Sequence, residues 1–254
     1  MANTSLLFCI FPMKPIKVPA LINKVIETNI LKPDELCSNK GKLYTFLNPV
    51  SYLDALRNKK LFADFDGIFA DGGLLVKAIK ILYGTSVERR SFDMTSMAPL
   101  LFGHASSHHQ DVAIVATKQK PLEKAIQTLR QKYPKLNISY YRNGYFADEK
   151  EMEDEARKLA EMNPDFLIVG MGIIIQERFL LKVKQAGFQG IGFTCGGFIH
   201  QTAENKADYY PQWINDYGLR FLYRMYKEPH TRKRYAKAAF VFPIKFIWEK
   251  FTAK

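Results

Sequence analysis

The 254-residue sequence has few cysteines and no cluster of metal-ligating side chains. Its three cysteines, Cys9, Cys37 and Cys195, are an odd number at wide spacing. This pattern argues against a disulfide framework and against a zinc cluster, and it fits a reducing compartment. The histidines do not supply a metal site either, because His108 and His109 lie in a polar stretch typical of a solvated helix end. We therefore expect neither a metal nor another cofactor.

Long apolar runs and a dinucleotide-binding fingerprint are also missing. The stretch SLLFCIFP at residues 5–12 is too short to span a bilayer, and it lacks the basic flank and the cleavage site of a signal peptide. We interpret it as a first buried strand in a protein that is not exported. No complete G-x-G-x-x-G motif follows a first strand, which argues against a nicotinamide-dependent dehydrogenase.

The residues that are present can build a large core and a strongly basic tail. Hydrophobic residues make up 47% and aromatic residues 13% of the sequence, which disfavours disorder. Residues 220–254 contain ten basic and two acidic residues, so they hold +8 of the formal net charge of +12. Such a block indicates a phosphate-rich partner: nucleic acid, an anionic lipid or a diphosphate. Because no stacking motif or recognition-helix pattern accompanies the charge, we expect no nucleic acid.

Strand-like runs alternate with helical patterns along most of the chain. Strands are predicted at 42–48, 67–70, 111–117, 137–146, 165–172 and 190–197, with helices between them at 49–62, 72–84, 120–134, 148–163 and 176–187. Short strands between helices of this length indicate βαβ units. The predicted fold is therefore α/β: a Rossmann-like, largely parallel sheet flanked by helices. We expect a body over residues 1–204 and a basic, helical C-terminal appendage over residues 205–254.

Three glycine-containing loops are expected at the carboxyl ends of strands, where open α/β sheets bind ligands. They are FADGG (69–73), VGMG (169–172) and TCGGF (194–198). Glycine lets the backbone approach a ligand closely, and the helix N-terminus that follows favours an anion. These glycines could equally serve tight packing, because none of the loops carries a full dinucleotide fingerprint.

Three aspartates surround the second predicted strand, and their expected roles differ. Asp66 precedes the strand and is typical of a turn, and Asp64 in the same loop is expected to be solvated. Asp71 follows the strand and precedes a helix, so it belongs to the ligand-binding edge. The residues themselves leave two roles open for Asp71: a helix N-cap or a catalytic carboxylate.

Several segments in the same order resemble the WecG/TagA/CpsF family, glycosyltransferase family 26. The resemblance covers most of residues 44–235 and is carried by YTFLNPVSYLDALRN (44–58), ADGGLLVKAIKILYG (70–84), YPKLNISYYRNGYF (133–146), NPDFLIVGMGIIIQERF (163–179), GFTCGGFIHQTA (192–203) and PQWINDYGLRFLYRMYKEPHTRKRY (211–235). It implies an inverting transferase that moves a sugar from a UDP-sugar to a polyprenyl-diphosphate-linked acceptor. The implied donor sugar is N-acetylmannosamine, its uronic acid or glucose, and the implied product is a cell-surface polysaccharide such as capsule.

The same resemblance assigns roles to individual residues. Asp71 matches the aspartate of the family's PDG motif and is the implied catalytic base. The implied substrate-binding residues are Thr45, Asn48, Asp93, Gly172, Gln176, Glu177, Gly196 and Gly197, and the implied diphosphate-binding arginines of the appendage are Arg220, Arg224, Arg232 and Arg234. The chain departs from the family pattern in two places. Thr45 is displaced by one residue, and three isoleucines at 173–175 make the loop before Gln176 more apolar.

An apolar stripe follows these arginines. Phe240, Ile244, Ile247, Trp248 and Phe251 have helical spacing, and nearby lysines lie largely off the stripe. Such an amphipathic helix suits the bilayer interface, although packing on the body or on another subunit of a homo-oligomer stays open. We therefore expect a cytoplasmic protein, peripheral on the inner face of the plasma membrane, with an anionic membrane surface as a partner. The alternative function is a non-catalytic partner that binds nucleotide sugar, membrane or nucleic acid.

Overall fold

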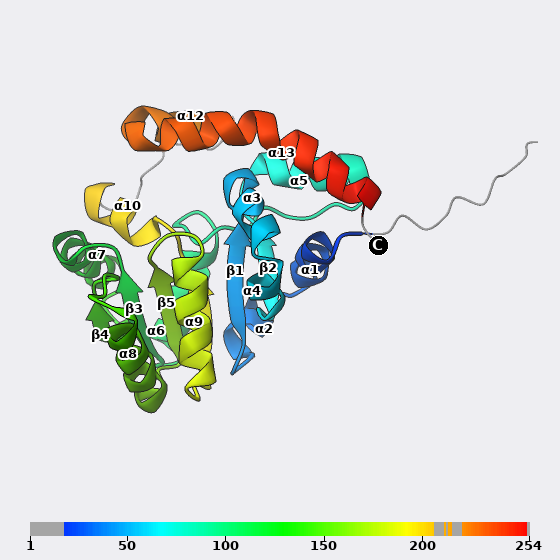
Figure 1. Ribbon diagram of the computed structural model, residues 1–254. Helices are drawn as coiled ribbons and strands as arrows, with labels where there is room; N and C mark the ends of the chain where they lie inside the picture. The colour runs from blue at the N-terminus through cyan, green and yellow to red at the C-terminus, as the bar shows by residue number, and fades with distance from the viewer. Residues whose placement is uncertain (1–17, 206–210, 212, 215–219, 253–254) are drawn as a thin grey trace, which may run out of the picture.

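The fold is built on one sheet of six parallel strands. The computed structural model describes residues 18–205, 211, 213–214 and 220–252. The strands are β1 (Leu43–Leu47), β2 (Gly67–Ala70), β3 (Asp111–Ala116), β4 (Asn137–Arg142), β5 (Phe166–Gly170) and β6 (Ile191–Thr194), in the spatial order β2-β1-β6-β5-β3-β4 (Figure 1). The predicted α/β class is confirmed. The strand predicted at residues 5–12 lies outside the described residues.

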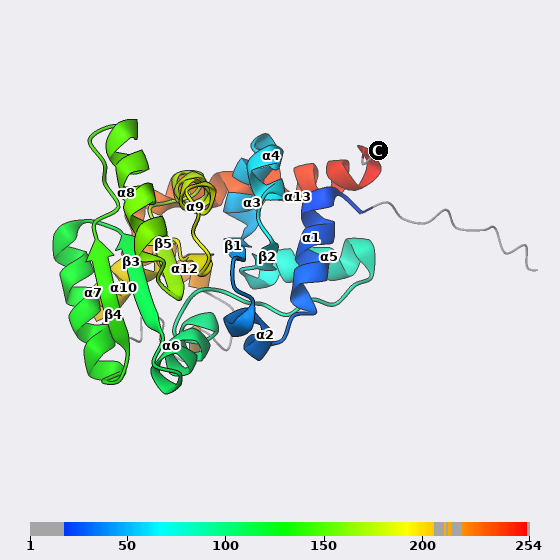
Figure 2. The same ribbon diagram turned by 90° about the horizontal axis from the view of Figure 1, so that it is seen from below.

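Helices connect the strands and cover both faces of the sheet (Figure 2). Their bounds are α1 (Ala20–Asn29), α2 (Pro33–Ser38), α3 (Pro49–Arg57), α4 (Lys59–Ala63), α5 (Gly73–Tyr83), α6 (Met97–Ser107), α7 (Gln119–Lys132), α8 (Glu149–Met162), α9 (Ile175–Gln185) and α10 (Phe198–Asn205). One core cluster joins the strands to α6, α7 and α10, and another joins them to α8 and α9. Because both faces are covered, a strand such as β5 is buried along its whole length.

Most predicted elements begin and end close to the expected residues, because their local signals are strong. Asp148 caps α8 by accepting a hydrogen bond from the Glu151 amide at 2.8 Å, and Gly84 follows α5 in the left-handed conformation at φ 71°. The helix predicted at 49–62 is instead two helices. Asn58 leaves the helical region, at φ −127° and ψ 38°, and separates α3 from α4.

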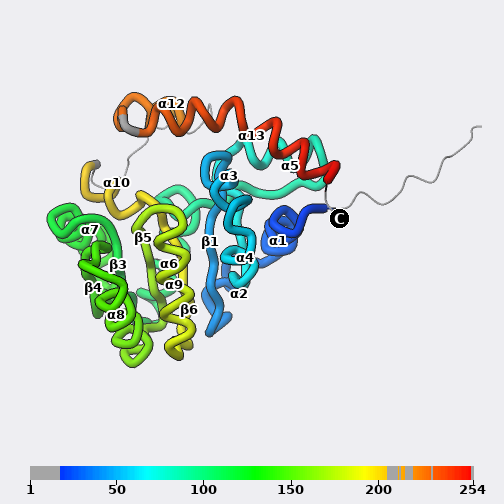
Figure 3. Tube along the Cα trace, viewed as in Figure 1, coloured from blue at the N-terminus to red at the C-terminus, as the bar shows by residue number. Residues whose placement is uncertain are grey.

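The appendage lies across the carboxyl edge of the sheet (Figure 1). It consists of α12 (Arg220–Lys227), a 3₁₀ turn η1 (Pro229–Thr231) and α13 (Arg232–Thr252). Phe242 and Phe246 are each 1% exposed, and their ring centroids lie 5.6 and 5.3 Å from that of Tyr52 on α3. The C-terminal part of α13 thus packs with α3 and α5, which come much earlier in the chain (Figure 3). Burying each phenylalanine is worth about 1.5–3 kcal/mol, so the rings fasten the appendage to the body.

Candidate active site

The loops at the carboxyl edge of the sheet gather most of the predicted site residues. Asn48 follows β1, Asp71 follows β2, Gly172 follows β5 and Gly196 follows β6. After β1 the chain turns into α3, which shares a core cluster with β2, whereas after β6 it turns into α10, which packs on α7. Figure 1 shows these two connections diverging, with α12 lying above the same edge. Open parallel sheets bind ligands where connections diverge in this way.

The backbone of Asp71 is fixed by a hydrogen bond to β1, whereas its side chain does not cap the helix that follows. Its amide donates a hydrogen bond to the Leu47 carbonyl at 2.7 Å, which extends the pairing of β2 with β1. Gly72, at φ 106°, is the N-cap residue of α5, and no side chain caps that helix. The N-cap role left open for Asp71 is therefore wrong. The Asp71 side chain is 32% exposed, which leaves its carboxylate accessible to a ligand.

Positive charge surrounds the Asp71 carboxylate. Arg89 Nη2 lies 3.7 Å from Asp71 Oδ1. Desolvation raises the pKa of Asp71 above its usual value. Arg89 opposes this rise in the pKa, Asp93 adds to it, and Arg224 and Arg220 of the appendage oppose it. A carboxylate with a raised pKa is a stronger proton acceptor, which is the property that a general base needs.

Asp93 binds two of the arginines that neighbour Asp71. Its Oδ2 accepts hydrogen bonds from Arg89 Nη2 at 2.8 Å and from Arg220 Nη1 at 2.7 Å. Burial alone would raise the pKa of Asp93, but Arg89, hydrogen bonds from Ser91 and Thr95, and Arg220 together lower it. The ionised Asp93 therefore holds both arginines in place. Its direct contact with substrate stays a prediction.

The four arginines predicted for the diphosphate divide into two pairs. Arg220 forms the ion pair with the half-buried Asp93 carboxylate described above. Arg224 lies against the loop after β6, because a Cβ atom added to Gly197 would be 3.0 Å from Arg224 Nη2. Arg232 and Arg234 are exposed on the first turn of α13. The α12 pair is thus better placed than the α13 pair to meet a ligand at the carboxyl edge.

The predicted polar residues around β1 differ in burial. Asn48 is half-buried and caps α3, with Oδ1 accepting hydrogen bonds from two first-turn amides at 3.0 Å each. Capping uses only Oδ1, so the Nδ2 group remains suited to other contacts. Thr45, Gln176 and Glu177 are buried, with exposed fractions of 0, 4 and 0%. Their contact with substrate stays a prediction, and in this structure they bind one another instead.

The glycine loops contain glycines of both roles considered from the sequence: some that let the backbone turn beside open space, and one that permits tight packing. Gly172 has φ 86° and Gly196 has φ 55°, conformations that other residues rarely adopt, and a Cβ atom on either would meet open space. Gly170 is a packing glycine, because its Cβ atom would lie 2.6 Å from Cys195 Sγ. The loops after β5 and β6 therefore offer open backbone turns on top of tightly packed strand ends.

Known proteins are similar to this chain along most of its length. Residues 21–254 match the sequence profile described as the Glycosyl transferase WecG/TagA/CpsF family. The chain belongs to this family. A relative from Shigella boydii, a UDP-Gal:alpha-D-GlcNAc-diphosphoundecaprenol beta-1,4-galactosyltransferase, is 33% identical over 90% of this chain and 94% of its own length. An N-acetylglucosaminyldiphosphoundecaprenol N-acetyl-beta-D-mannosaminyltransferase from Bacillus spizizenii is 24% identical over 80% of this chain and 78% of its own length.

The protein is therefore a glycosyltransferase. Of the three aspartates around β2, Asp64 and Asp66 lie away from the candidate site. Asp64 is exposed, as predicted. Asp66 accepts hydrogen bonds from Lys42 Nζ at 2.9 Å, Lys184 Nζ at 2.8 Å and the Leu43 amide at 2.9 Å. Burial alone would raise the pKa of Asp66, but these hydrogen bonds lower it. Asp66 thus joins β1 to α9, a larger role than that of the turn residue predicted from sequence.

Three residues that the sequence reasoning missed border the site of the transferase. Arg89 lies beside Asp71, and its place in the charged segment ERRSFD is the signal that could have indicated it. Glu228 accepts a hydrogen bond from Arg224 Nε at 3.2 Å and is 9% exposed. Tyr235 of α13 lies near Arg224: burial raises the pKa of Tyr235, and the Arg224 charge opposes the rise. The sequence offered no signal for Glu228 or Tyr235, because each depends on where α12 and α13 meet.

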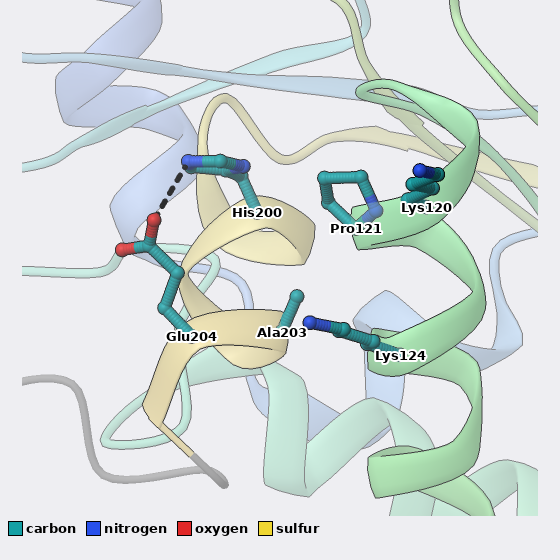
Figure 4. A pocket seen from close by; sticks show the side chains of 6 residues that line it. All are labelled: Lys120, Pro121, Lys124, His200, Ala203 and Glu204. Atoms are coloured by element: carbon teal, nitrogen blue, oxygen red, sulfur yellow. Dashed lines mark ion pairs between the residues drawn. The ribbon is translucent and has the colours of Figure 1, made fainter.

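A surface pocket between α7 and α10 is lined by other residues (Figure 4). They are Lys120, Pro121, Lys124, His200, Ala203 and Glu204, with His200 Nε2 lying 3.2 Å from Glu204 Oε1. None of these six is a predicted site residue of the transferase. The pocket therefore adds nothing to the candidate active site.

Replacing Asp71 by asparagine is expected to raise the melting temperature of the transferase near neutral pH. Because the pKa of Asp71 is raised in the folded state, its ionised carboxylate is less stable there than in the unfolded chain. The stabilisation from protonated Asp71 is complete below the unfolded pKa and is lost as pH rises through the folded pKa. Thermal unfolding between about pH 4 and pH 7 should show an advantage of Asp71→Asn that grows with pH. A variant less stable than the parent at neutral pH would contradict this view of Asp71.

Proposed function

We propose that this glycosyltransferase moves a sugar from a UDP-sugar to a polyprenyl-diphosphate-linked acceptor with inversion at the anomeric carbon. The observation that carries the proposal is the Asp71 carboxylate, partly exposed at the carboxyl edge and with a raised pKa. Arg224 of the appendage is among its charged neighbours. A candidate base and a candidate cation for the leaving group are therefore close to each other.

In the proposed reaction an acceptor hydroxyl attacks the anomeric carbon of the donor while Asp71 takes the hydroxyl proton. The bond from the anomeric carbon to the diphosphate breaks, and its electron pair leaves with UDP. One displacement of this kind inverts the anomeric configuration. Negative charge grows on the departing diphosphate, and we assign its stabilisation to Arg224, Arg220 and the Gly196–Gly197 backbone, without a metal ion. Arginine suits this task because its planar fork binds two phosphate oxygens at once.

The names of the two relatives agree on the acceptor but differ in the sugar that is transferred. Both names contain N-acetylglucosamine joined through a diphosphate to undecaprenol, and we propose the same acceptor class for this chain. The transferred groups differ, since one name specifies a galactosyl and the other an N-acetylmannosaminyl group. Galactose therefore joins N-acetylmannosamine, its uronic acid and glucose among the donor sugars to be tested.

A panel of UDP-sugars with synthetic acceptors tests the proposal. Each donor is incubated with N-acetylglucosamine on a short prenyl diphosphate, and both UDP release and the anomeric configuration of the product are measured. We expect one donor to give UDP and an inverted product with the parent protein and far less with Asp71→Asn. UDP binding without turnover of any donor would favour the non-catalytic alternative. Retention of configuration would overturn the direct displacement.

The exposed stripe of α13 is proposed to bring the transferase to an anionic membrane surface. Among the described residues, no helix has both the length and the apolarity needed to cross a bilayer. The five stripe residues are nevertheless exposed, from 45% at Ile247 to 78% at Phe240 and Phe251, while Phe242 and Phe246 fill the opposite, buried face of the helix. One face of α13 therefore packs on the body, and the opposite face exposes the apolar stripe.

Charged replacements in the stripe should release the protein from vesicles. Ile244→Glu combined with Phe251→Glu is expected to lower co-sedimentation with phosphatidylglycerol vesicles several-fold, because each change removes apolar contact and adds repulsion. Transfer to a short-chain soluble acceptor should stay close to the parent value. Leu100→Glu, at a 44% exposed position on α6, is the matched control. Equal pelleting of all three proteins would contradict membrane docking through α13. Deleting the helix is a poorer test, since it would remove the buried phenylalanines.

A further inference from the structure

A fully buried carboxylate joins the two glycine loops of the site. Glu177 on the first turn of α9 is 0% exposed. Its Oε1 accepts hydrogen bonds from Thr45 Oγ1 at 3.0 Å and from Gln176 Nε2 at 2.8 Å, and its Oε2 accepts one from the Ile174 amide at 2.5 Å. Burying a carboxylate costs several kcal/mol unless donors compensate it, and here three donors converge on one group.

The network reaches the loop after β6 through the neighbouring amide. Gln176 Oε1 accepts a hydrogen bond from the Gly196 backbone amide at 3.2 Å. Thr45 on β1 also shares a hydrogen bond of 2.8 Å with Thr194 at the end of β6. The side chains of Gln176 and Glu177 therefore fix the turn that presents Gly196 and Gly197, and they do so from inside the protein.

The same carboxylate holds a strained residue in the loop after β5. Ile174 has φ 74°, which is a rare conformation for a β-branched side chain and costs on the order of 1–3 kcal/mol. The hydrogen bond to Glu177 fixes its amide, and Ile173 and Ile174 pack against the core cluster that contains Phe242 and Phe246. Two of the three isoleucines that depart from the family pattern thus pack against the cluster that anchors α13, whereas Ile175 is exposed.

We propose that Glu177 is a positioning residue that holds the loops after β5 and β6 in the shape that receives the donor diphosphate. The inference rests on the proposed function, and it differs from the direct donor contact implied by the family resemblance. Glu177 acts through Gln176 on the Gly196 turn and through the Ile174 amide on the Gly172 turn. Burial raises the pKa of Glu177, and the hydrogen bonds from Gln176, Thr45 and Ile174 oppose that rise.

Calorimetric titration with UDP, the product of the proposed reaction, tests this role on the full-length chain. The side chain of Glu177→Gln has one accepting oxygen in place of two. If that oxygen accepts the hydrogen bond from Thr45, the NH2 group faces the Ile174 amide and cannot accept its hydrogen bond. We expect UDP affinity to fall by roughly tenfold or more, as for loss of a hydrogen bond to a charged group, while the melting temperature changes by only a few degrees. Glu155→Gln, which alters another mostly buried carboxylate, 11% exposed, should bind UDP like the parent.

A second variant separates positioning from general stabilisation. Glycine adopts positive φ without the cost paid by isoleucine, so Ile174→Gly in the Glu177→Gln background should restore most of the lost UDP affinity. Parent-like binding by Glu177→Gln would overturn the inference alone. Weak binding that Ile174→Gly fails to restore, together with a large drop in melting temperature, would also overturn it. A parent protein that does not bind UDP would overturn the proposed function and this inference with it.

Discussion

The Asp71→Asn variant is expected to transfer sugar roughly 10²–10⁴-fold more slowly than the parent, because it loses the general base. The loss should appear in kcat at saturating donor and acceptor, since asparagine keeps the size and polarity of the side chain but accepts no proton. The acid limb of the parent's pH–rate profile should lie above the ordinary aspartate pKa, because desolvation raises the pKa of Asp71. Initial rates of UDP release across pH measure both effects.

Asp66→Asn provides the matched control for this experiment. Asp66 binds Lys42 and Lys184, and its pKa is lowered in the folded state, so its ionised form stabilises the fold above the unfolded pKa. The Asp66 variant should lose melting temperature and keep most of its transfer rate, whereas the Asp71 variant should do the reverse. If Asp66→Asn abolished transfer and Asp71→Asn did not, the catalytic base would have been assigned to the wrong carboxylate.

Arg224→Ala should produce the second large loss. Its guanidinium lies against Gly197 and is oriented by a hydrogen bond to Glu228, so it is placed to bind the departing diphosphate. Removal of one charge-assisted hydrogen bond costs ~1.5–3 kcal/mol, which corresponds to a loss on the order of 10- to 100-fold in transfer and in UDP affinity. Titration with UDP and a transfer assay with a soluble acceptor measure the two quantities separately.

Arg234, which is exposed on α13, provides the matched control for Arg224. Arg234→Ala removes the same charge from the same basic tail, and we expect less than a threefold change with a soluble acceptor, as is usual for an exposed charge. Equal losses in both variants would mean that the tail acts through its overall charge. No loss in either would remove the appendage from the proposed active site.

Local signals were sufficient to predict the main helices and strands of the body. The sheet was predictable because buried parallel strands such as FLIVG at 166–170 are continuously apolar and are separated by amphipathic helices. The end of a strand before a helix placed Asp71 at the ligand-binding edge of this fold class, but only the family resemblance indicated it as the candidate base. The break at Asn58 was not predicted, since the apolar spacing of α3 and α4 continues across it.

The sequence by itself determined the α/β class, the family and the basic character of the appendage, and it indicated the strand ends of the candidate site. Each of these depends on short segments and on their order along the chain. Only the tertiary structure decided which of these residues meet. Thr45 and Glu177 are far apart in sequence and share a buried hydrogen bond, and Arg224 reaches Gly197 only through the path of the appendage. Burial and pKa shifts arise from neighbours that folding brings together, so the surroundings of Glu177 and Tyr235 could not be derived from local pattern.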